Sequence, residues 1–153
     1  MGVSVHGWVE VCRVPEARNE TYGWSGLIRL DALIDVCDVV SEVVFGFSKR
    51  VFTDGLPFEP LACGRGIPVN PSYMVTRELE AIREHERQHG VGEYFGYTHV
   101  LYDEVLRVEW AKYGITRLSD SCWWRVFRML DTLYGSDEAF APERTRITAW
   151  VSW

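Results

Sequence analysis

The sequence predicts an α+β fold, in which a small, mostly antiparallel sheet includes both terminal strands and packs against about three helices. Three observations support this fold class. Both ends of the chain alternate apolar and polar residues, as strands do, whereas three interior segments repeat apolar residues at helical spacing. The chain has 153 residues, 47% hydrophobic and 14% aromatic, so residues 1–153 can fill one core and form a single domain.

The first predicted strand covers residues 3–12. Valines occupy alternate positions there, and His6, Trp8 and Glu10 lie between them on the other face, a pattern typical of a half-buried strand. The last predicted strand covers residues 146–153 and alternates in the same way. Because pairing within one sheet protects the termini from fraying, we expect these two strands to be neighbours.

A polar segment broken by glycine, residues 15–26, follows the first strand and suits a hairpin loop or an irregular crossover. The first predicted helix begins at Asp31 as its N-cap and ends at Gly46. Its second half is dense in β-branched residues, which also favour a strand. The last predicted helix covers residues 119–134, and Gly135 is its expected stop.

The middle helix is predicted from the residues at its ends. Asn70 is the expected N-cap, Pro71 the first helical residue and Gly90 the stop. After a turn rich in glycine, residues 97–101 suit a short strand and residues 103–110 a short helix. These elements complete the predicted α+β arrangement.

Residues 47–71 are predicted to form one long, structured loop. The segment contains four prolines and three glycines, a composition that excludes long regular elements. Loops of this length inside a compact domain are uncommon and often functional. We therefore look here first for a binding site.

Within this loop, Arg65 stands between Gly64 and Gly66. Glycines allow successive backbone N–H groups to point to one side as a nest for an anion, and a guanidinium can bind phosphate or carboxylate through two hydrogen bonds. Trp8 could add a stacking surface and His99 a proton donor. These five residues are the candidate ligand-binding residues; a tight turn with a solvated arginine is the simpler alternative.

The segment from His85 to His89 matches the H-E-x-x-H pattern of zinc peptidases, and Gly92 extends the match. A zinc-dependent hydrolase is therefore an alternative hypothesis, with His85 and His89 as ligands and Glu86 as the base. Phe95, however, stands where the third histidine of such enzymes would be. Histidines in the last turn of a helix also interact favourably with the helix dipole. We expect no catalytic residue, no metal and no other cofactor.

The charge and cysteine content restrict the partners. The net charge is −6, from 22 acidic and 16 basic residues, and no basic stripe is present to bind extended nucleic acid. No apolar run approaches the roughly 18 residues that cross a bilayer, so no membrane partner is expected. Four cysteines without a C-x-x-C pair suit reduced thiols in the cytoplasm. The excess of aromatic residues favours an open groove or a contact between copies in a homo-oligomer.

Four blocks of the chain carry a resemblance: G-V-x-x-x-G-W-V-E-V (residues 2–11), F-G-F (45–47), F-E-P-L-A-C-G-R-G-I-P (58–68) and T-H-V-L-Y-D-E-V-L-R-V-E-W (98–110). Together with the closing strand rich in tryptophan, they resemble a group of uncharacterised small proteins from bacteriophages and actinobacteria. No activity is known for this group, so the resemblance implies no catalytic residue. It implies that residues 75–92 are a variable connection between the shared blocks.

Together these observations predict a non-enzymatic, phage-type binding protein that acts in the host cytoplasm. Its expected ligand is a small anionic, nucleotide-like molecule, such as a nucleotide signal of host defence. Two alternatives stay open: an inhibitor that binds a host protein, and the zinc-dependent hydrolase. The phage setting rests on analogy with small phage proteins that act by binding.

Overall fold

The computed structural model describes residues 2–35, 37–48 and 56–153. The strands of its sheet are β1 (Ser4–Val11), β2 (Ser25–Arg29), β3 (Tyr94–Leu101) and β4 (Thr145–Ser152). Their order is β2-β1-β4-β3, and every neighbouring pair is antiparallel. The expected pairing of the two terminal strands is confirmed, because β1 and β4 pair along their whole length.

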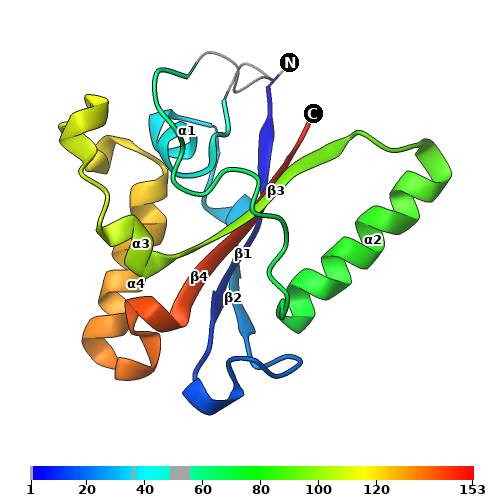
Figure 1. Ribbon diagram of the computed structural model, residues 1–153, viewed down its shortest axis with the longest axis horizontal. Helices are drawn as coiled ribbons and strands as arrows, with labels where there is room; N and C mark the ends of the chain where they lie inside the picture. Colours follow the sequence, from blue (N-terminus) through cyan, green and yellow to red (C-terminus); the bar gives the residue numbers. More distant parts are fainter. Residues whose placement is uncertain (1, 36, 49–55) are drawn as a thin grey trace.

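Helices cover both faces of this sheet (Figure 1). One face carries α2 (Tyr73–His89) alone, whereas α1 (Val39–Phe45), α3 (Tyr102–Leu106) and α4 (Trp123–Ser136) lie on the other. The predicted α+β class is therefore confirmed. The short 3-10 helices are η1 (Pro15–Ala17), η2 (Leu30–Ala32), η3 (Trp110–Tyr113), η4 (Leu118–Asp120), η5 (Glu138–Phe140) and η6 (Pro142–Arg144).

The core has two parts, one on each side of the sheet. The larger part contains Val5 and Val9 of β1 and buried residues of α1 and α4, including Trp123 and Phe127. The smaller part lies under α2 and contains Trp8 and Trp150. Because α2 covers this second face, Trp8 is 9% and Glu10 0% exposed. The expectation of a half-buried first strand is therefore wrong: β1 is buried on both faces.

The first helix begins later than predicted. Its N-cap is Asp38, whose carboxylate accepts hydrogen bonds from the N–H groups of Val40 and Ser41, and the Ser41 hydroxyl accepts one from the N–H of Asp38. This reciprocal capping box fixes the helix start. Asp31, the predicted cap, lies in η2 instead. The predicted end is confirmed, because Gly46 is the C-cap in the left-handed conformation, with φ 73°.

Ser72, and not Asn70, is the N-cap of α2. The Ser72 hydroxyl accepts a hydrogen bond from the Val75 N–H at 3.3 Å. The N–H of Ser72 donates to the buried carboxylate of Glu10 at 2.6 Å, so a long-range contact sets where the helix starts. The predicted end at Gly90 is confirmed.

The remaining elements differ from the prediction mainly at their ends. β2 was not predicted, and β3 begins three residues before the expected strand at 97–101. The expected helix at 103–110 is divided between α3 and η3. α4 begins at Trp123 after η4 and continues through Gly135 to Ser136, so the glycine does not stop it.

The described part of the predicted long loop, residues 47–48 and 56–71, contains no helix or strand. Residues 49–55 of this prediction lie outside the described residues. The loop is attached at several points: the N–H groups of Leu61 and Ala62 donate to carbonyls of α1 at 2.9 and 2.7 Å, and the Gly66 N–H donates to Tyr97 of β3 at 2.9 Å. The segment therefore bridges α1 and the edge of the sheet.

Candidate functional site

A buried polar network joins the sheet to the start of α2. The Glu10 carboxylate accepts hydrogen bonds from Arg146 Nε at 2.8 Å, Thr148 Oγ1 at 2.5 Å and the Ser72 N–H at 2.6 Å. Arg146, 4% exposed, also donates to the Asn70 side chain at 3.1 Å and to its carbonyl at 2.7 Å. The network therefore positions the last residues of the long loop and the first turn of α2.

The hydrogen-bonding groups of Arg65, the predicted centre of the binding site, already have partners within the protein. Its guanidinium makes two hydrogen bonds of 3.0 Å to the Glu104 carboxylate and one of 2.9 Å to the Leu61 carbonyl. Its backbone N–H donates to Thr98 Oγ1 at 3.3 Å. An anion would have to displace Glu104 to reach this arginine, so Arg65 holds the loop to α3 in this structure.

The predicted anion nest is also closed. Gly64 and Gly66 have positive φ of 65° and 77°, as a nest requires. However, the Gly66 N–H donates to the Tyr97 carbonyl, and His99 Nδ1 donates to the Gly66 carbonyl at 2.8 Å. In this structure the N–H groups of Arg65 and Gly66 therefore bind β3 and not an anion.

Trp8 does not join the Arg65 loop. Its ring is buried under α2, and its indole N–H donates to Glu78 of that helix at 2.6 Å. His99 does lie beside the loop, since its carbonyl is 3.5 Å from Arg65 Nη1. Of the predicted ligand-binding residues, the structure therefore brings together Gly64, Arg65, Gly66 and His99, and places Trp8 elsewhere.

The H-E-x-x-H segment forms the last turns of α2. His85 Nε2 is 2.6 Å from the Glu93 carboxylate, and His89 Nδ1 donates to the His85 carbonyl at 3.1 Å. Phe95 packs against Trp153 with ring centroids 5.2 Å apart. Within the described residues, no group of three or more histidine, cysteine, aspartate or glutamate side chains could hold a metal ion.

A groove of about 560 Å³ lies between the end of the long loop and α2. Its polar groups are Thr76, Arg83 and Glu86 of α2 and Tyr97 of β3. Arg83 forms no ion pair with a described residue, in contrast to Arg65. The mainly apolar remainder of the lining consists of Gly66, Ile67, Pro68, Val69, Pro71, Leu79 and Ile82.

Tyr97 contributes both a ring and a hydroxyl to this groove. Its ring centroid is 5.9 Å from that of Trp150. Burial raises the pKa of Tyr97, and the carboxylate of Glu86 raises it further, whereas Arg83 opposes the shift. The hydroxyl is therefore protonated at neutral pH and can donate a hydrogen bond.

Trp150 lies beneath the groove with an unsatisfied donor. It is 0% exposed and belongs to the core part under α2, against which Leu79 and Tyr97 pack. Its indole N–H has no hydrogen-bond partner among the described residues. Nearly all buried donors in proteins are satisfied, so this N–H is an exception within the core under α2.

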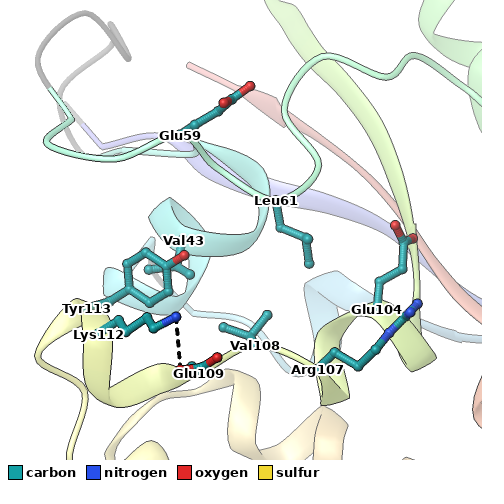
Figure 2. Close-up of a pocket in the computed structure, with 9 residues that line it drawn as sticks. All are labelled: Val43, Glu59, Leu61, Glu104, Arg107, Val108, Glu109, Lys112 and Tyr113. Carbon is teal, nitrogen blue, oxygen red and sulfur yellow. Dashed lines mark ion pairs between the residues drawn. The ribbon is translucent and has the colours of Figure 1, made fainter.

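A second cavity, of about 510 Å³, lies between the long loop and the α3–η3 segment (Figure 2). It is lined by more charges, but its cations are paired within the protein. Lys112 is 3.0 Å from Glu109, and Arg107 is 3.1 Å from Asp103. This cavity therefore offers a ligand less uncompensated positive charge than the groove that contains Arg83.

Comparisons with known proteins add no assignment. No family model, no curated protein and no solved structure matches the chain. In the part of the chain that the structure describes, no helix combines the length and apolar character needed to span a membrane. The fold and the groove thus define an α+β protein with a partly apolar ligand-sized site.

Proposed function

We propose that this protein binds a small anionic, nucleotide-like ligand, without turning it over, in the groove between the long loop and α2. The proposal keeps the ligand class expected from the sequence and moves its principal cation from Arg65 to Arg83. The observation that carries it is an arginine without an ion-pair partner among the described residues, set among apolar walls in one groove. The unsatisfied N–H of Trp150 lies in the core against which the groove residues Leu79 and Tyr97 pack. A volume of about 560 Å³ is within the range of small-molecule sites.

Each polar group selects one part of the ligand. Arg83 would bind a phosphate or carboxylate, and Glu86 would accept a hydrogen bond from an exocyclic amine. Tyr97 offers a ring face to a planar base, and its hydroxyl can donate. An acceptor atom that reaches Trp150 would satisfy its buried N–H. These groups fit an aromatic base that carries an amine and a phosphate better than a purely apolar molecule.

The phage origin and the action in a host cell are proposed on the resemblance alone. If the protein is phage-encoded, it would act in the host cytoplasm and sequester a nucleotide signal of host defence. A homo-oligomer and the alternative of a host-protein inhibitor also remain proposals. Val69, at the rim of the groove and fully exposed, is an apolar residue that either kind of partner could cover.

The test is a thermal-shift screen against cyclic and linear nucleotides, followed by calorimetric titration. A ligand present at 100 times its Kd stabilises the folded state by about 2.7 kcal/mol, which for a chain of this size raises the Tm by roughly 5 to 10 °C. We expect such a shift for at least one nucleotide. No shift across the panel would reject the proposal and direct attention to host-protein capture.

Two arginine variants locate the site. Arg83→Ala should weaken binding by about 2 kcal/mol, or roughly thirtyfold, because it removes a charge-assisted hydrogen bond. Arg87→Ala is the matched control, since Arg87 lies one turn further along α2, does not line the groove and pairs with Glu84. Equal losses in the two variants would contradict the assignment of the groove.

A further inference from the structure

Three side chains on the α2 side of the sheet form a continuous chain of hydrogen bonds. His6 Nδ1 is 2.5 Å from Asp31 Oδ1, and His6 Nε2 is 2.7 Å from Ser152 Oγ. The order is carboxylate, imidazole, hydroxyl, with one ring nitrogen for each neighbour. This is the connectivity of Ser-His-Asp catalytic triads, which are recognised by geometry and not by sequence position.

The fold brings the three residues together from distant parts of the chain. In the β1–β4 ladder His6 faces Trp150, so Ser152 lies two residues along β4 on the same side of the sheet. β2 ends at Arg29, and the following η2 turn carries Asp31 to the side of His6. Arg29 also lies 3.3 Å from the second oxygen of Asp31. The carboxylate is therefore held in place on the side away from the imidazole.

The three side chains differ in exposure. Those of His6 and Asp31 are 21% and 31% exposed, whereas Ser152 is 6% exposed. Tyr94 of β3 pairs with Ser152, and its ring centroid is 5.9 Å from that of His6. Because Ser152 is almost fully buried, only a small acyl or phosphonyl donor is considered as its substrate.

Tyr94, whose ring lies near that of His6, also carries a hydroxyl. Burial raises the pKa of Tyr94, and the charges of Glu93, Glu78 and Asp31 raise it further. The hydroxyl therefore stays protonated at neutral pH. Within the described residues no hydrogen bond of this hydroxyl is found, and Tyr94 pairs with Ser152 in the β3–β4 ladder. We therefore assign Tyr94 as a candidate donor to an oxyanion at Ser152.

We propose that Ser152 is a nucleophile toward small activated esters, with His6 as its general base and Asp31 as the residue that positions His6. Ser152 Oγ attacks the carbonyl carbon, and its proton moves to His6 Nε2. The ester C–O bond then breaks, and the leaving alkoxide takes that proton, which leaves an acyl-serine. Water attacks the acyl group with His6 again as base, releases the carboxylic acid and restores the serine.

This activity is independent of the proposed ligand groove. Neither His6, Asp31 nor Ser152 lines that groove. Loss of nucleotide binding in Arg83→Ala would therefore leave the serine chemistry unchanged, and failure of one proposal does not decide the other.

The test is covalent labelling of the folded wild-type chain by a small alkyl fluorophosphonate, followed by peptide mapping. Ser152 Oγ forms a bond to phosphorus, fluoride leaves, and the serine proton passes to His6. We expect one label per chain, on Ser152. Ser4 is the internal control, because it is exposed and lies opposite Ser152 in the β1–β4 ladder. No label on Ser152, or equal labelling of Ser4, would overturn the proposal.

Variants of His6 and Asp31 distinguish a catalytic role of these residues from a purely structural one. Among variants with a wild-type circular dichroism spectrum, His6→Gln should slow labelling by about 100-fold or more, the usual contribution of a general base. Asp31→Asn should lower kcat for p-nitrophenyl acetate by at least about tenfold and leave KM unchanged, because Asp31 acts through His6. A folded His6→Gln protein that is labelled at the wild-type rate would show that the contacts are structural only.

Discussion

Replacing Glu10 by glutamine removes the charge of a carboxylate that is 0% exposed and accepts hydrogen bonds from Arg146, Thr148 and Ser72. Glutamine keeps the size of the side chain, so no cavity forms. Its amide nitrogen, however, cannot accept a hydrogen bond, and Arg146 loses its counter-charge while it stays 4% exposed. The variant therefore isolates the electrostatic contribution of the network that fixes the start of α2.

The expected loss follows from the burial of the pair. Removing one partner of a buried salt bridge typically destabilises a protein by about 3 to 5 kcal/mol. Arg146 keeps two hydrogen bonds to Asn70 and a stacking contact with Trp24, 4.0 Å from the ring centroid. These contacts place the expected loss near the lower end, at about 3 kcal/mol, which corresponds to a fall in Tm of roughly 6 to 12 °C.

Urea unfolding followed by tryptophan fluorescence measures this loss. Lys112→Ala is the control, because the Lys112–Glu109 pair is 3.0 Å long but its side chains are 67% and 69% exposed, so its loss should cost at most about 0.5 kcal/mol. Adding Arg146→Met to Glu10→Gln should recover part of the stability, since no unpaired charge then remains. A loss below about 1 kcal/mol for Glu10→Gln would refute the reasoning.

Three more tests concern two glycines of the backbone, the dependence of stability on acidic pH, and metal binding by His85 and His89. Gly7 has φ 133°, and Gly7→Ala places a Cβ against the Thr148 carbonyl oxygen, so the free energy of unfolding should fall by on the order of 3 kcal/mol in urea unfolding. Gly64 has φ 65° but lies in open space, so Gly64→Ala should lower the free energy of unfolding by about 1 kcal/mol. Burial alone would raise the pKa of Glu104, but hydrogen bonds and charge from Arg65 outweigh it and leave the pKa below its ordinary value. The stability from this pair is present above that ordinary value, about 4.3, and is lost as the pH falls through the lower folded-state pKa. Arg65→Ala should therefore flatten the acid limb of a Tm-against-pH curve, and an unchanged limb would contradict the assignment. Chelation by EDTA should leave the Tm unchanged, because the described residues gather no metal-binding cluster; a fall in Tm together with zinc in the purified protein would restore the hydrolase alternative.

The sheet could be predicted where local spacing carries the information. Alternation at both ends of the chain identified β1 and β4 and suggested their pairing. The start of the first helix could not be placed, because Asp31 and Asp38 are equally suitable caps locally. Asp38 is selected by its contacts with Ser41 and, through a 2.6 Å hydrogen bond, with Ser121 near α4. β2 was missed because it is five residues long and contains Gly26.

The candidate site was harder to predict because its residues depend on packing between distant elements. Sequence reasoning treated Arg65 as available, but Glu104, 39 residues later, neutralises it. It treated Trp8 as an open stacking surface, whereas α2 covers it. Arg83 was not singled out from the sequence, although its spacing from Leu79 places it on the groove-facing side of α2.

The Asp31, His6 and Ser152 contacts were beyond local reasoning for the same reason. Asp31 and Ser152 lie 25 and 146 positions from His6 in the sequence, and the three residues match no motif spacing. A polar face on β1 was visible in the sequence, but its partners could be found only once the strand order β2-β1-β4-β3 was known.

The most direct test of the binding groove is to follow the indole N–H of Trp150 by ¹H–¹⁵N NMR during titration with the nucleotide that gives the largest thermal shift. Trp150→Phe assigns the resonance among those of the seven tryptophans. The proposed function predicts that this resonance shifts with the same Kd as calorimetry, and that Arg83→Ala weakens that shift. A ligand that binds but leaves the Trp150 resonance unmoved would contradict the placement of the site.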